Sequence, residues 1–251
     1  MKINYKSDSV NIKSDKSYDN IDSWNLEKRC KDYQENEPHT IQWVSSFDNN
    51  SIFYDIGSNI GGYSFIAYMA NKNLKVYSFE PNFMNFYTQL KTCKENNISN
   101  IFPINIAINN SNKFNYFNYS ILGNGGDGSF GDELKNQMIN SDYMNPFSPH
   151  NKISLEIGVL GLSLDSLIYD FGLDVPNYLK IDVDGNELLV LKGAQKLLNE
   201  EKVKEIFIEI DDKIYVNSEI ENFLKQFSFD IYKDINVGSI EKPIRMVLFK
   251  K

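Results

Sequence analysis

The sequence has few of the residues that build disulfide frameworks and zinc sites. Its 251 residues include two cysteines, Cys30 and Cys93, and two histidines, His39 and His150. Two cysteines 63 positions apart in a chain with two histidines form neither a disulfide framework nor a CxxC site, and they nearly exclude a Cys/His zinc cluster. A chain of this length buries enough surface to fold without such cross-links.

Long hydrophobic runs and a positive charge excess are also missing. No stretch approaches the roughly 18 apolar residues of a membrane-spanning helix, and residues 1–20 lack the apolar core of a secretory signal. We therefore expect no membrane span and a cytoplasmic protein in a reducing compartment. The formal charge of −8 argues against a protein that mainly grips nucleic acid, because that function requires a basic surface.

The chain does contain a regular alternation of short apolar runs and longer amphipathic stretches. The apolar runs predict strands at 51–56, 75–79, 101–106, 178–183 and 203–210. The amphipathic stretches between them predict helices at 60–70, 84–96, 164–171, 187–199 and 219–227. Two final strands, 229–233 and 244–249, are expected to close the sheet as an antiparallel edge.

Repeated β-α-β units predict an α/β fold, with a mainly parallel sheet covered by helices on both faces. We assign residues 1–22 to a flexible N-terminal arm and residues 23–251 to a single domain, which begins with a helical extension over 23–47. A variable insert at about 109–160 interrupts the alternation, although 113–119 has the pattern of a strand. Loops on such a scaffold carry function, so the insert is where we expect substrate specificity.

The first predicted strand-to-helix turn is rich in glycine and carries an acid. Residues 55–62 read DIGSNIGG, and glycines there allow the backbone to approach a ligand closely. The turn is not a dinucleotide GxGxxG motif, because Asn59 stands where the second glycine belongs, and no Gly-Lys-Ser/Thr follows to make a P-loop. The Asp55 carboxylate would repel a pyrophosphate, but it would suit a ligand that carries an ammonium and a sulfonium.

The second strand also ends in an acid. Glu80 follows the predicted strand 75–79 directly. A carboxylate at the tip of this strand is placed to accept both hydroxyls of an adenosine ribose. The alternative is a solvated surface glutamate ahead of a helix, which the neighbouring Asp55 loop makes the weaker interpretation.

Several blocks of the sequence, in this order, resemble the FkbM family of S-adenosylmethionine-dependent methyltransferases. They are FYDIGSNIGGYS, VYSFEP, YLKIDVDGNELLVLKGA and IFIEID, preceded by EPHTIQW. The resemblance implies a class I methyltransferase fold, which is Rossmann-like with a seven-stranded sheet, and usually methylation of a hydroxyl on a sugar or natural product. The chain departs from the family at Ser58, where alanine is frequent, and at Asp184, where glutamate is frequent.

The resemblance also implies the cofactor, the acceptor and the residues that bind the cofactor. S-adenosylmethionine would donate a methyl group to a hydroxyl of a sugar or nucleotide-linked sugar, in the biosynthesis of a bacterial surface polysaccharide. The cofactor-binding residues would be Glu37, Asp55, Gly57, Ser58, Asn59, Gly61, Glu80, Pro81, Ala107 and Asp182.

Methylation of a sugar hydroxyl requires a base or a metal ion, because the hydroxyl has a high pKa. Strand alternation puts Lys180 and Asp182 on one side, with Asp182 beside the donor site. Glu209 and Asp211 make a second acidic strand tip next to it. Our hypothesis is that Asp182, with Glu209 or Asp211, binds Mg²⁺ or Mn²⁺, or that Asp182 is itself the base.

Other candidates have competing structural interpretations. Lys180 is either part of the catalytic machinery or a counter-charge for the neighbouring acids. His150, within the insert, is the better histidine candidate for contact with the acceptor, and the loop 125–130 is a candidate wall of the acceptor site. Asp184 and Glu187 match a helix capping box.

Two other functions stay open from the sequence alone. One is an NAD-dependent sugar dehydrogenase or epimerase, although the chain lacks GxGxxG and a well-placed Tyr-x-x-x-Lys pair. The other is a non-catalytic binding module on the same fold. The expected partner is a small sugar or nucleotide-sugar rather than nucleic acid, and a homodimer is an arrangement that the sequence leaves open.

Overall fold

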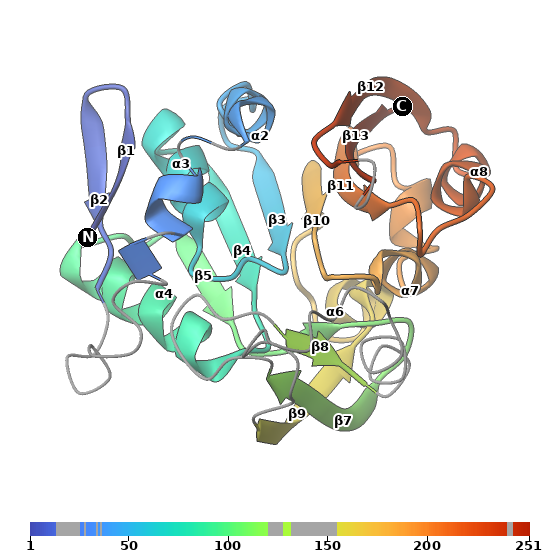
Figure 1. The fold of residues 1–251 in the computed structure, drawn as a ribbon, viewed down its shortest axis with the longest axis horizontal. Coiled ribbons are helices and arrows are strands. Elements are labelled where there is room, and N and C mark those ends of the chain that lie inside the picture. Colours follow the sequence, from blue (N-terminus) through green and yellow to red (C-terminus); the bar gives the residue numbers. More distant parts are fainter. Residues whose placement is uncertain are drawn as a thin grey trace.

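A computed structural model of the chain describes residues 1–13, 26–27, 29–33, 35, 37–119, 128–131, 155–239 and 243–251. Its centre is a seven-stranded sheet with helices on both faces (Figure 1). The strands are β3 (Ile52–Ile56), β4 (Lys75–Phe79), β5 (Ile101–Ile104), β10 (Tyr178–Ile181), β11 (Glu205–Asp211), β12 (Asp230–Asn236) and β13 (Ile244–Lys250).

The sheet is mainly parallel, as predicted. Its strand order is β12-β13-β11-β10-β3-β4-β5, and the pairs from β11 to β5 are all parallel. Strand β13 runs antiparallel to both β11 and β12, so the sheet is mixed and the last two strands close it as the expected antiparallel edge. The inner strand β10 is buried along its whole length, which explains its nearly continuous apolar sequence.

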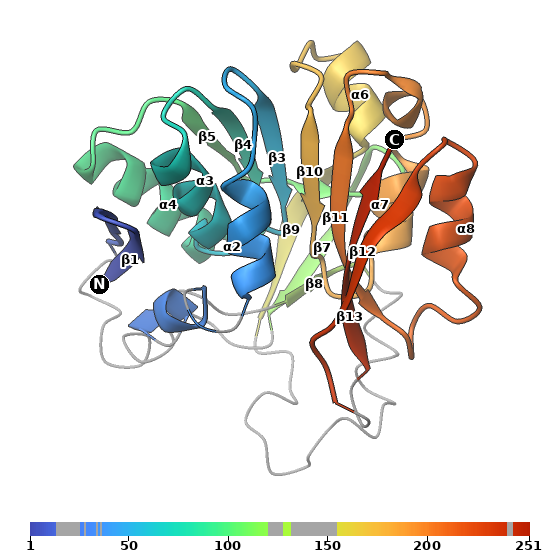
Figure 2. The same cartoon turned by 90° about the horizontal axis from the view of Figure 1, so that it is seen from above.

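Helices cover the sheet in two layers (Figure 2). One layer contains α2 (Pro38–Val44), α3 (Gly62–Ala70) and α4 (Phe83–Glu95). The other contains α6 (Leu164–Tyr169), α7 (Glu187–Lys192), a 3-10 turn at Leu197–Asn199 and α8 (Glu219–Lys225). Each layer buries its own cluster of apolar side chains against one face of the sheet.

The single helix predicted over 187–199 is divided in two. Helix α7 ends at Lys192, and Gly193 follows as its C-cap. A Cβ atom on Gly193 would lie 2.2 Å from the carbonyl oxygen of Asn109, so only glycine fits this approach. The Asp165 carboxylate then accepts hydrogen bonds from the backbone N–H groups of Lys196 and Leu197, which begin the 3-10 turn.

The N-terminal residues differ from the flexible arm expected over 1–22. Strands β1 (Lys2–Tyr5) and β2 (Asp8–Asn11) form an antiparallel hairpin. Ile3 and Val10 face each other across the hairpin and are buried in the same apolar cluster as α2 and α3. The sequence interpretation missed this because the apolar residues alternate with period two inside a strongly polar segment. The remainder of the expected arm, residues 14–22, lies outside the described residues.

The Ile3→Ala substitution is expected to destabilise the protein by about 2–5 kcal/mol. Ile3 is 0% exposed, so truncation both removes apolar burial and leaves a cavity. Lys2→Ala changes the exposed neighbour on the same strand and is expected to alter stability by no more than about 0.5 kcal/mol. Chemical denaturation of both variants would measure the difference. Equal stability of the two would mean that the hairpin contributes little to the folded state.

The insert contains a second sheet that the sequence interpretation largely missed. Its strands are β6 (Ala107–Ile108), β7 (Lys113–Tyr119), β8 (Gly128–Phe130) and β9 (Leu155–Leu162), in the order β6-β9-β7-β8. Strand β7 corresponds to the predicted strand 113–119. Strand β9 escaped prediction because it contains two glycines, each of which makes room for an aromatic ring. A Cβ on Gly158 would lie 2.3 Å from the Phe114 ring, and one on Gly161 would lie 2.6 Å from the Phe130 ring.

Helix α2 is held to the sheet by its tryptophan. The Trp43 indole N–H donates to a carboxylate oxygen of Glu205 at 2.7 Å, and its ring packs against Phe207 with 5.0 Å between the centroids. Cys30 and Cys93 are both buried, and neither forms a disulfide within the part of the chain that the structure describes. Within the described ranges, no helix is long and apolar enough to cross a membrane.

Candidate functional site

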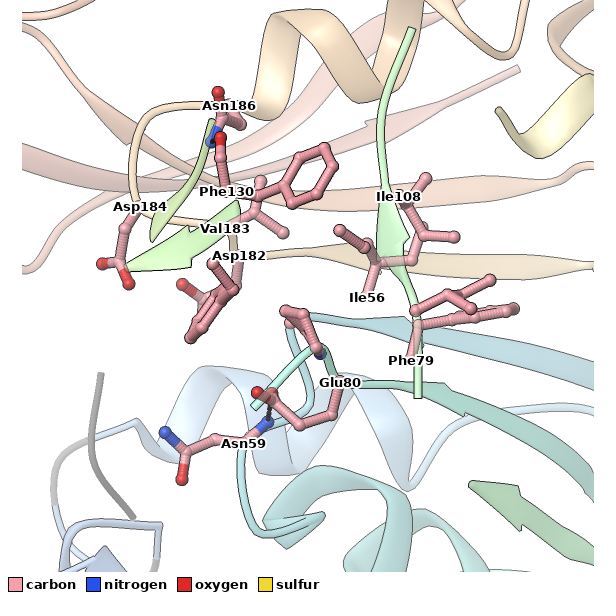
Figure 3. Close-up of a pocket in the computed structure, with 15 residues that line it drawn as sticks. Ile56, Asn59, Phe79, Glu80, Ile108, Phe130, Asp182, Val183, Asp184 and Asn186 are labelled. Atoms are coloured by element: carbon pink, nitrogen blue, oxygen red, sulfur yellow. Dashed lines mark hydrogen bonds between the residues drawn. The ribbon is translucent and has the colours of Figure 1, made fainter. Parts of the chain in front are cut away.

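A cleft opens at the carboxyl ends of β3, β4 and β10, where ligands bind in open α/β sheets. It contains about 570 Å³ of space, including the part open to solvent. Figure 3 shows Glu80 and Asn59 on one side, and Asp182 and Asp184 across from them. The lining residues are Ile56, Gly57, Asn59, Phe79, Glu80, Pro81, Ile106, Ala107, Ile108, Phe117, Phe130, Asp182, Val183, Asp184 and Asn186.

The turn after β3 lies very close to the end of β10. Gly57 has φ +77°, and a Cβ atom there would lie 1.8 Å from the Asp182 carbonyl oxygen. The N–H groups of Gly57 and Ser58 both donate to the carbonyl oxygen of Phe79. The glycine therefore lets one short turn join the ends of β3, β4 and β10 around the cleft.

A buried glutamine, Gln89, holds this turn in place through hydrogen bonds, and the sequence interpretation missed it. The Gln89 side-chain amide donates to the Ser58 hydroxyl at 2.9 Å and to the Asn59 carbonyl oxygen at 2.6 Å. Its own amide oxygen accepts a hydrogen bond from the Ser78 hydroxyl. No local sequence signal marks Gln89, because its partners lie 11 to 31 positions away along the chain.

Glu80 presents a restrained carboxylate to the cleft. Its side chain is held at both oxygens, which accept from the Asn59 N–H at 2.7 Å and the Asn82 N–H at 2.8 Å (Figure 3). The residue is only 5% exposed. A carboxylate has about four lone-pair positions, so it has the capacity to accept from a ligand's hydroxyl groups as well. This geometry suits a ligand with two adjacent hydroxyls.

Asp55 lies behind the turn and does not line the cleft. One carboxylate oxygen accepts from the Ser64 N–H at 3.1 Å and the Ser64 hydroxyl at 2.6 Å, which caps the first turn of α3. The other oxygen is buried with no hydrogen-bond partner among the described residues. Burial raises the pKa of Asp55, while the nearby Lys180 ammonium opposes this shift. Asp55 therefore acts on the site through its charge and the position of α3.

The other residues expected to bind the cofactor fall into two groups, those that line the cleft and those that do not. Gly61 is the N-cap of α3 and packs against Gln89, and Ser58 is buried beneath the turn. Glu37 precedes α2, where it accepts a hydrogen bond from the Thr40 hydroxyl at 2.8 Å. The members of the expected set that line the cleft are Gly57, Asn59, Glu80, Pro81, Ala107 and Asp182.

Lys180 is a buried counter-charge rather than a group that lines the cleft. It is 1% exposed, its ammonium bonds to the Asp182 carboxylate at 2.5 Å, and it lies 5.0 Å from the centre of the Tyr63 ring. Burial alone would lower the pKa of Lys180, but the charges of Asp182, Glu37 and Asp55 raise it overall. Lys180 therefore stays charged at neutral pH, holds Asp182 in place and cannot serve as a base.

Glu209 lies beside Asp182 on the neighbouring strand. Strands β10 and β11 pair with Ile181 opposite Ile208, so the next residues along, Asp182 and Glu209, are lateral neighbours on one face. The charge of Asp182, followed by burial and the charge of Asp184, raises the pKa of Glu209 to about 9.

The structure does not support a metal ion held by Asp182, Glu209 and Asp211. Among the residues described, no three histidine, cysteine, aspartate or glutamate side chains are placed to hold one. An oxygen of Asp182 is bonded to Lys180, and an Asp211 oxygen accepts from the Lys213 N–H at 2.8 Å within its own turn. The strand tips are acidic, as expected, and the carboxylates of Asp182 and Asp211 bond to these other partners.

The loop after β10 is organised differently from the predicted capping box. Asn186, rather than Asp184, is the N-cap of α7. The Glu187 carboxylate reaches back to accept from the N–H groups of Val183 and Gly185, both at 3.1 Å. The Tyr215 hydroxyl donates to the Gly185 carbonyl oxygen at 2.6 Å. These contacts hold the segment 182–186, which forms one wall of the cleft.

Two aromatic side chains of the insert also line the cleft. Phe117 of β7 and Phe130 of β8 line the cleft, and the Asn186 side-chain amide contacts the Phe130 carbonyl oxygen at 3.5 Å. Phe130 of the predicted acceptor loop 125–130 thus lines the cleft, whereas residues 125–127 lie outside the described residues, as does His150. His39 is not among the lining residues, and its ring nitrogen contacts the Lys233 ammonium at 3.1 Å.

Known proteins were compared with the chain by sequence and by structure. The sequence model of the methyltransferase FkbM domain matches residues 55–231, whereas no curated protein matches. The fold is similar to that of methyltransferase FkbM from Methylobacillus flagellatus KT, with TM-score 0.54 and 15% identity over 82% of this chain and 44% of that chain. It is also similar to magnesium protoporphyrin IX methyltransferase from Synechocystis PCC 6803 with bound S-adenosylmethionine, with TM-score 0.52 and 8% identity over 91% and 84%.

Proposed function

The chain belongs to the FkbM methyltransferase family, and from this we propose that it transfers a methyl group from S-adenosylmethionine to a hydroxyl of a sugar or nucleotide-linked sugar. The observation that carries the proposal is the pairing of Glu80 and Asp182 across one cleft (Figure 3). One carboxylate suits a ribose, and the other suits the proton of an acceptor hydroxyl. The family match favours this function over the dehydrogenase alternative.

The cleft has groups suited to each part of the donor. Glu80 would accept hydrogen bonds from the ribose hydroxyls, and the apolar side chains of Ile106, Ala107 and Ile108 would contact the adenine. Gly57 permits a close approach of backbone to ligand. The acids near Asp182 favour a ligand that brings an ammonium and a sulfonium, because opposite charges attract strongly where water is partly excluded.

Asp182 is the group we assign to proton removal. When bound, the donor would supply an already activated methyl group, so the protein's work is to orient the acceptor and take its proton. Lys180 holds the Asp182 carboxylate at the edge of the cleft. The aromatic wall of Phe117 and Phe130 offers apolar surface on which one face of a sugar ring can pack.

A wider role follows from the acceptor we propose. A nucleotide-linked sugar methylated in the cytoplasm would feed the assembly of a surface polysaccharide. The chain spans 44% of the length of the Methylobacillus protein, so the activity of that longer protein is not carried over to this one.

Titration with S-adenosylhomocysteine, the demethylated product, tests the donor assignment. We expect binding in the micromolar range, and we expect Glu80→Gln to weaken it by about tenfold to a hundredfold, because a charged acceptor of ribose hydroxyl groups becomes a neutral amide. Glu219→Gln is the matched control, since Glu219 is an exposed residue on α8. Calorimetry would measure the affinity of the unmodified protein and of both variants for S-adenosylhomocysteine. Failure of the unmodified protein to bind would overturn the proposed function.

A further inference from the structure

Asn105 joins the segment after β4 to the end of β5. It directly follows β5, and its side-chain amide donates to the Glu80 carbonyl oxygen at 2.8 Å and to the Pro81 carbonyl oxygen at 3.0 Å. The Glu80 N–H donates in turn to the Ile104 carbonyl oxygen at 3.1 Å. The backbone and the Asn105 side chain therefore connect the same two segments.

The segment between β4 and α4 needs a partner of this kind. Asn82 is the N-cap of α4, so the carbonyl groups of Glu80 and Pro81 lie ahead of the helix and find no hydrogen-bond donor within it. Pro81 also lacks an N–H group with which the segment could pair to a neighbour. The Asn105 amide supplies two N–H donors in one place, one for each carbonyl.

The two segments that Asn105 joins both line the cleft. Glu80 and Pro81 line it from the segment after β4, and Ile106 and Ala107 line it from the segment after β5. Under the proposed function, the Glu80 carboxylate accepts from the ribose hydroxyls, and the apolar residues after β5 contact the adenine. The distance between the two segments therefore sets the distance between the two parts of the adenosine site.

We propose that Asn105 is a positioning residue for the adenosine half of the donor, because it holds Glu80 at the distance from Ile106 and Ala107 that adenosine requires. The inference rests on the proposed function, since adenosine is the part of the donor that would contact both segments. The lining of the cleft comprises the residues on either side of Asn105 rather than Asn105 itself, so it acts through them.

Other hydrogen bonds hold the end of the cleft where the methionine half would lie. The Asp182 N–H donates to the Ile56 carbonyl oxygen at 3.1 Å, and the Gly57 N–H donates to the Phe79 carbonyl oxygen at 3.0 Å. Neither bond involves Asn105 or the segment after β5. Loss of the Asn105 bridge should therefore weaken contacts with the adenosine half and leave those with the methionine half unchanged.

Calorimetric titration of the full chain with two ligands tests this division. S-adenosylhomocysteine contains both halves, whereas 5′-methylthioadenosine contains the adenosine and the sulfur without the amino acid. We expect Asn105→Ala to weaken the binding of each ligand by the same factor, about tenfold, because both share the adenosine. A disturbance of the whole cleft would instead weaken S-adenosylhomocysteine more, since that ligand also contacts the methionine end.

The Asn105→Asp substitution separates the hydrogen bonds from the shape of the side chain. Aspartate has nearly the same shape as asparagine, but its carboxylate donates no hydrogen bond and would repel the carbonyl oxygens of Glu80 and Pro81. We expect its loss of affinity to be at least as large as that of Asn105→Ala. If the side chain only filled space, Asn105→Asp would keep the affinity of the unmodified protein.

Asn100→Ala is the matched control, because Asn100 forms the same kind of bridge at the other end of β5. It directly precedes the strand, and its amide donates to the carbonyl oxygens of Lys72 at 2.9 Å and Leu74 at 2.5 Å. This bridge lies at the amino edge of the parallel strands, opposite the cleft. Both alanine variants should lower the melting temperature by similar amounts, whereas Asn100→Ala should bind both ligands as the unmodified protein does.

The outcomes separate this inference from the function on which it rests. If the unmodified protein binds neither ligand, the proposed function fails and the inference fails with it. If it binds S-adenosylhomocysteine but not 5′-methylthioadenosine, or if either Asn105 variant binds both ligands normally, the function stands and the inference is overturned. Equal weakening by Asn100→Ala, or a much larger loss for S-adenosylhomocysteine than for 5′-methylthioadenosine, would also overturn it, because the bridge would then act on the fold as a whole.

Discussion

The Asp182→Asn substitution is expected to lower methyl transfer by about 10²- to 10⁴-fold while binding of S-adenosylhomocysteine changes little. An amide cannot accept the proton of an acceptor hydroxyl, but it has nearly the same shape as the carboxylate. The loss should therefore appear in kcat rather than in the affinity for the donor product. This separation distinguishes a base from a residue that only binds the donor.

Stability is the competing explanation for such a loss. Asp182→Asn removes the direct partner of the buried Lys180 ammonium, and an uncompensated buried charge is strongly destabilising. The charges of Glu37 and Asp55 also act on Lys180, so we expect the variant to remain folded with a lowered melting temperature. Asp182→Glu keeps the charge and should recover stability, although a longer side chain displaces the proton acceptor.

Asp184→Asn is the matched control for this experiment. Asp184 lines the same cleft two residues further along, but the Lys180 ammonium bonds to Asp182. We expect its effect on turnover to be less than about tenfold. The assay would follow formation of S-adenosylhomocysteine with a panel of sugars and nucleotide-linked sugars. Full turnover by Asp182→Asn would remove Asp182 from the role of base.

Local patterns predicted the central sheet well, because a parallel sheet leaves a strong local signal. The strand at Lys75–Phe79 was predicted at its exact bounds, and Glu80 was identified from its place directly after a strand and Asp182 from its place near the end of one. Both inferences use one rule, which is that the carboxyl ends of parallel strands meet at the same edge. No knowledge of distant contacts is required.

Distant contacts explain what the sequence interpretation missed. Gln89 and Tyr215 hold the turns around the cleft, but their partners are far away along the chain, so neither residue stands out locally. For Asp55, the sequence interpretation predicted its place in the turn after the first strand correctly, but it did not predict the contact of its carboxylate with Ser64. Its carboxylate turns toward Ser64 because the helix after the turn needs a cap. The sequence places a residue on an element more reliably than it directs a side chain.

The Gly57→Ala substitution is expected to destabilise the protein by about 3 kcal/mol or more and to weaken donor binding by at least about a hundredfold. Two costs combine here. A residue with a side chain is strained at φ +77°, by about 1–2 kcal/mol. In addition, the new Cβ would lie 1.8 Å from the Asp182 carbonyl oxygen, so either β10 or the turn after β3 must move.

Gly172→Ala isolates the first of these costs. Gly172 has nearly the same backbone conformation, with φ +78°, but no atom lies within 4 Å of where its Cβ would be. It should therefore lose only the strain, about 1–2 kcal/mol, and bind S-adenosylhomocysteine normally. Denaturation and calorimetry of both variants measure the difference. If the two variants lose equal stability and both still bind, the approach of the glycine turn to Asp182 does not shape the donor site. If Gly57→Ala alone loses binding, the distance between that turn and the end of β10 is what makes the cleft fit its ligand.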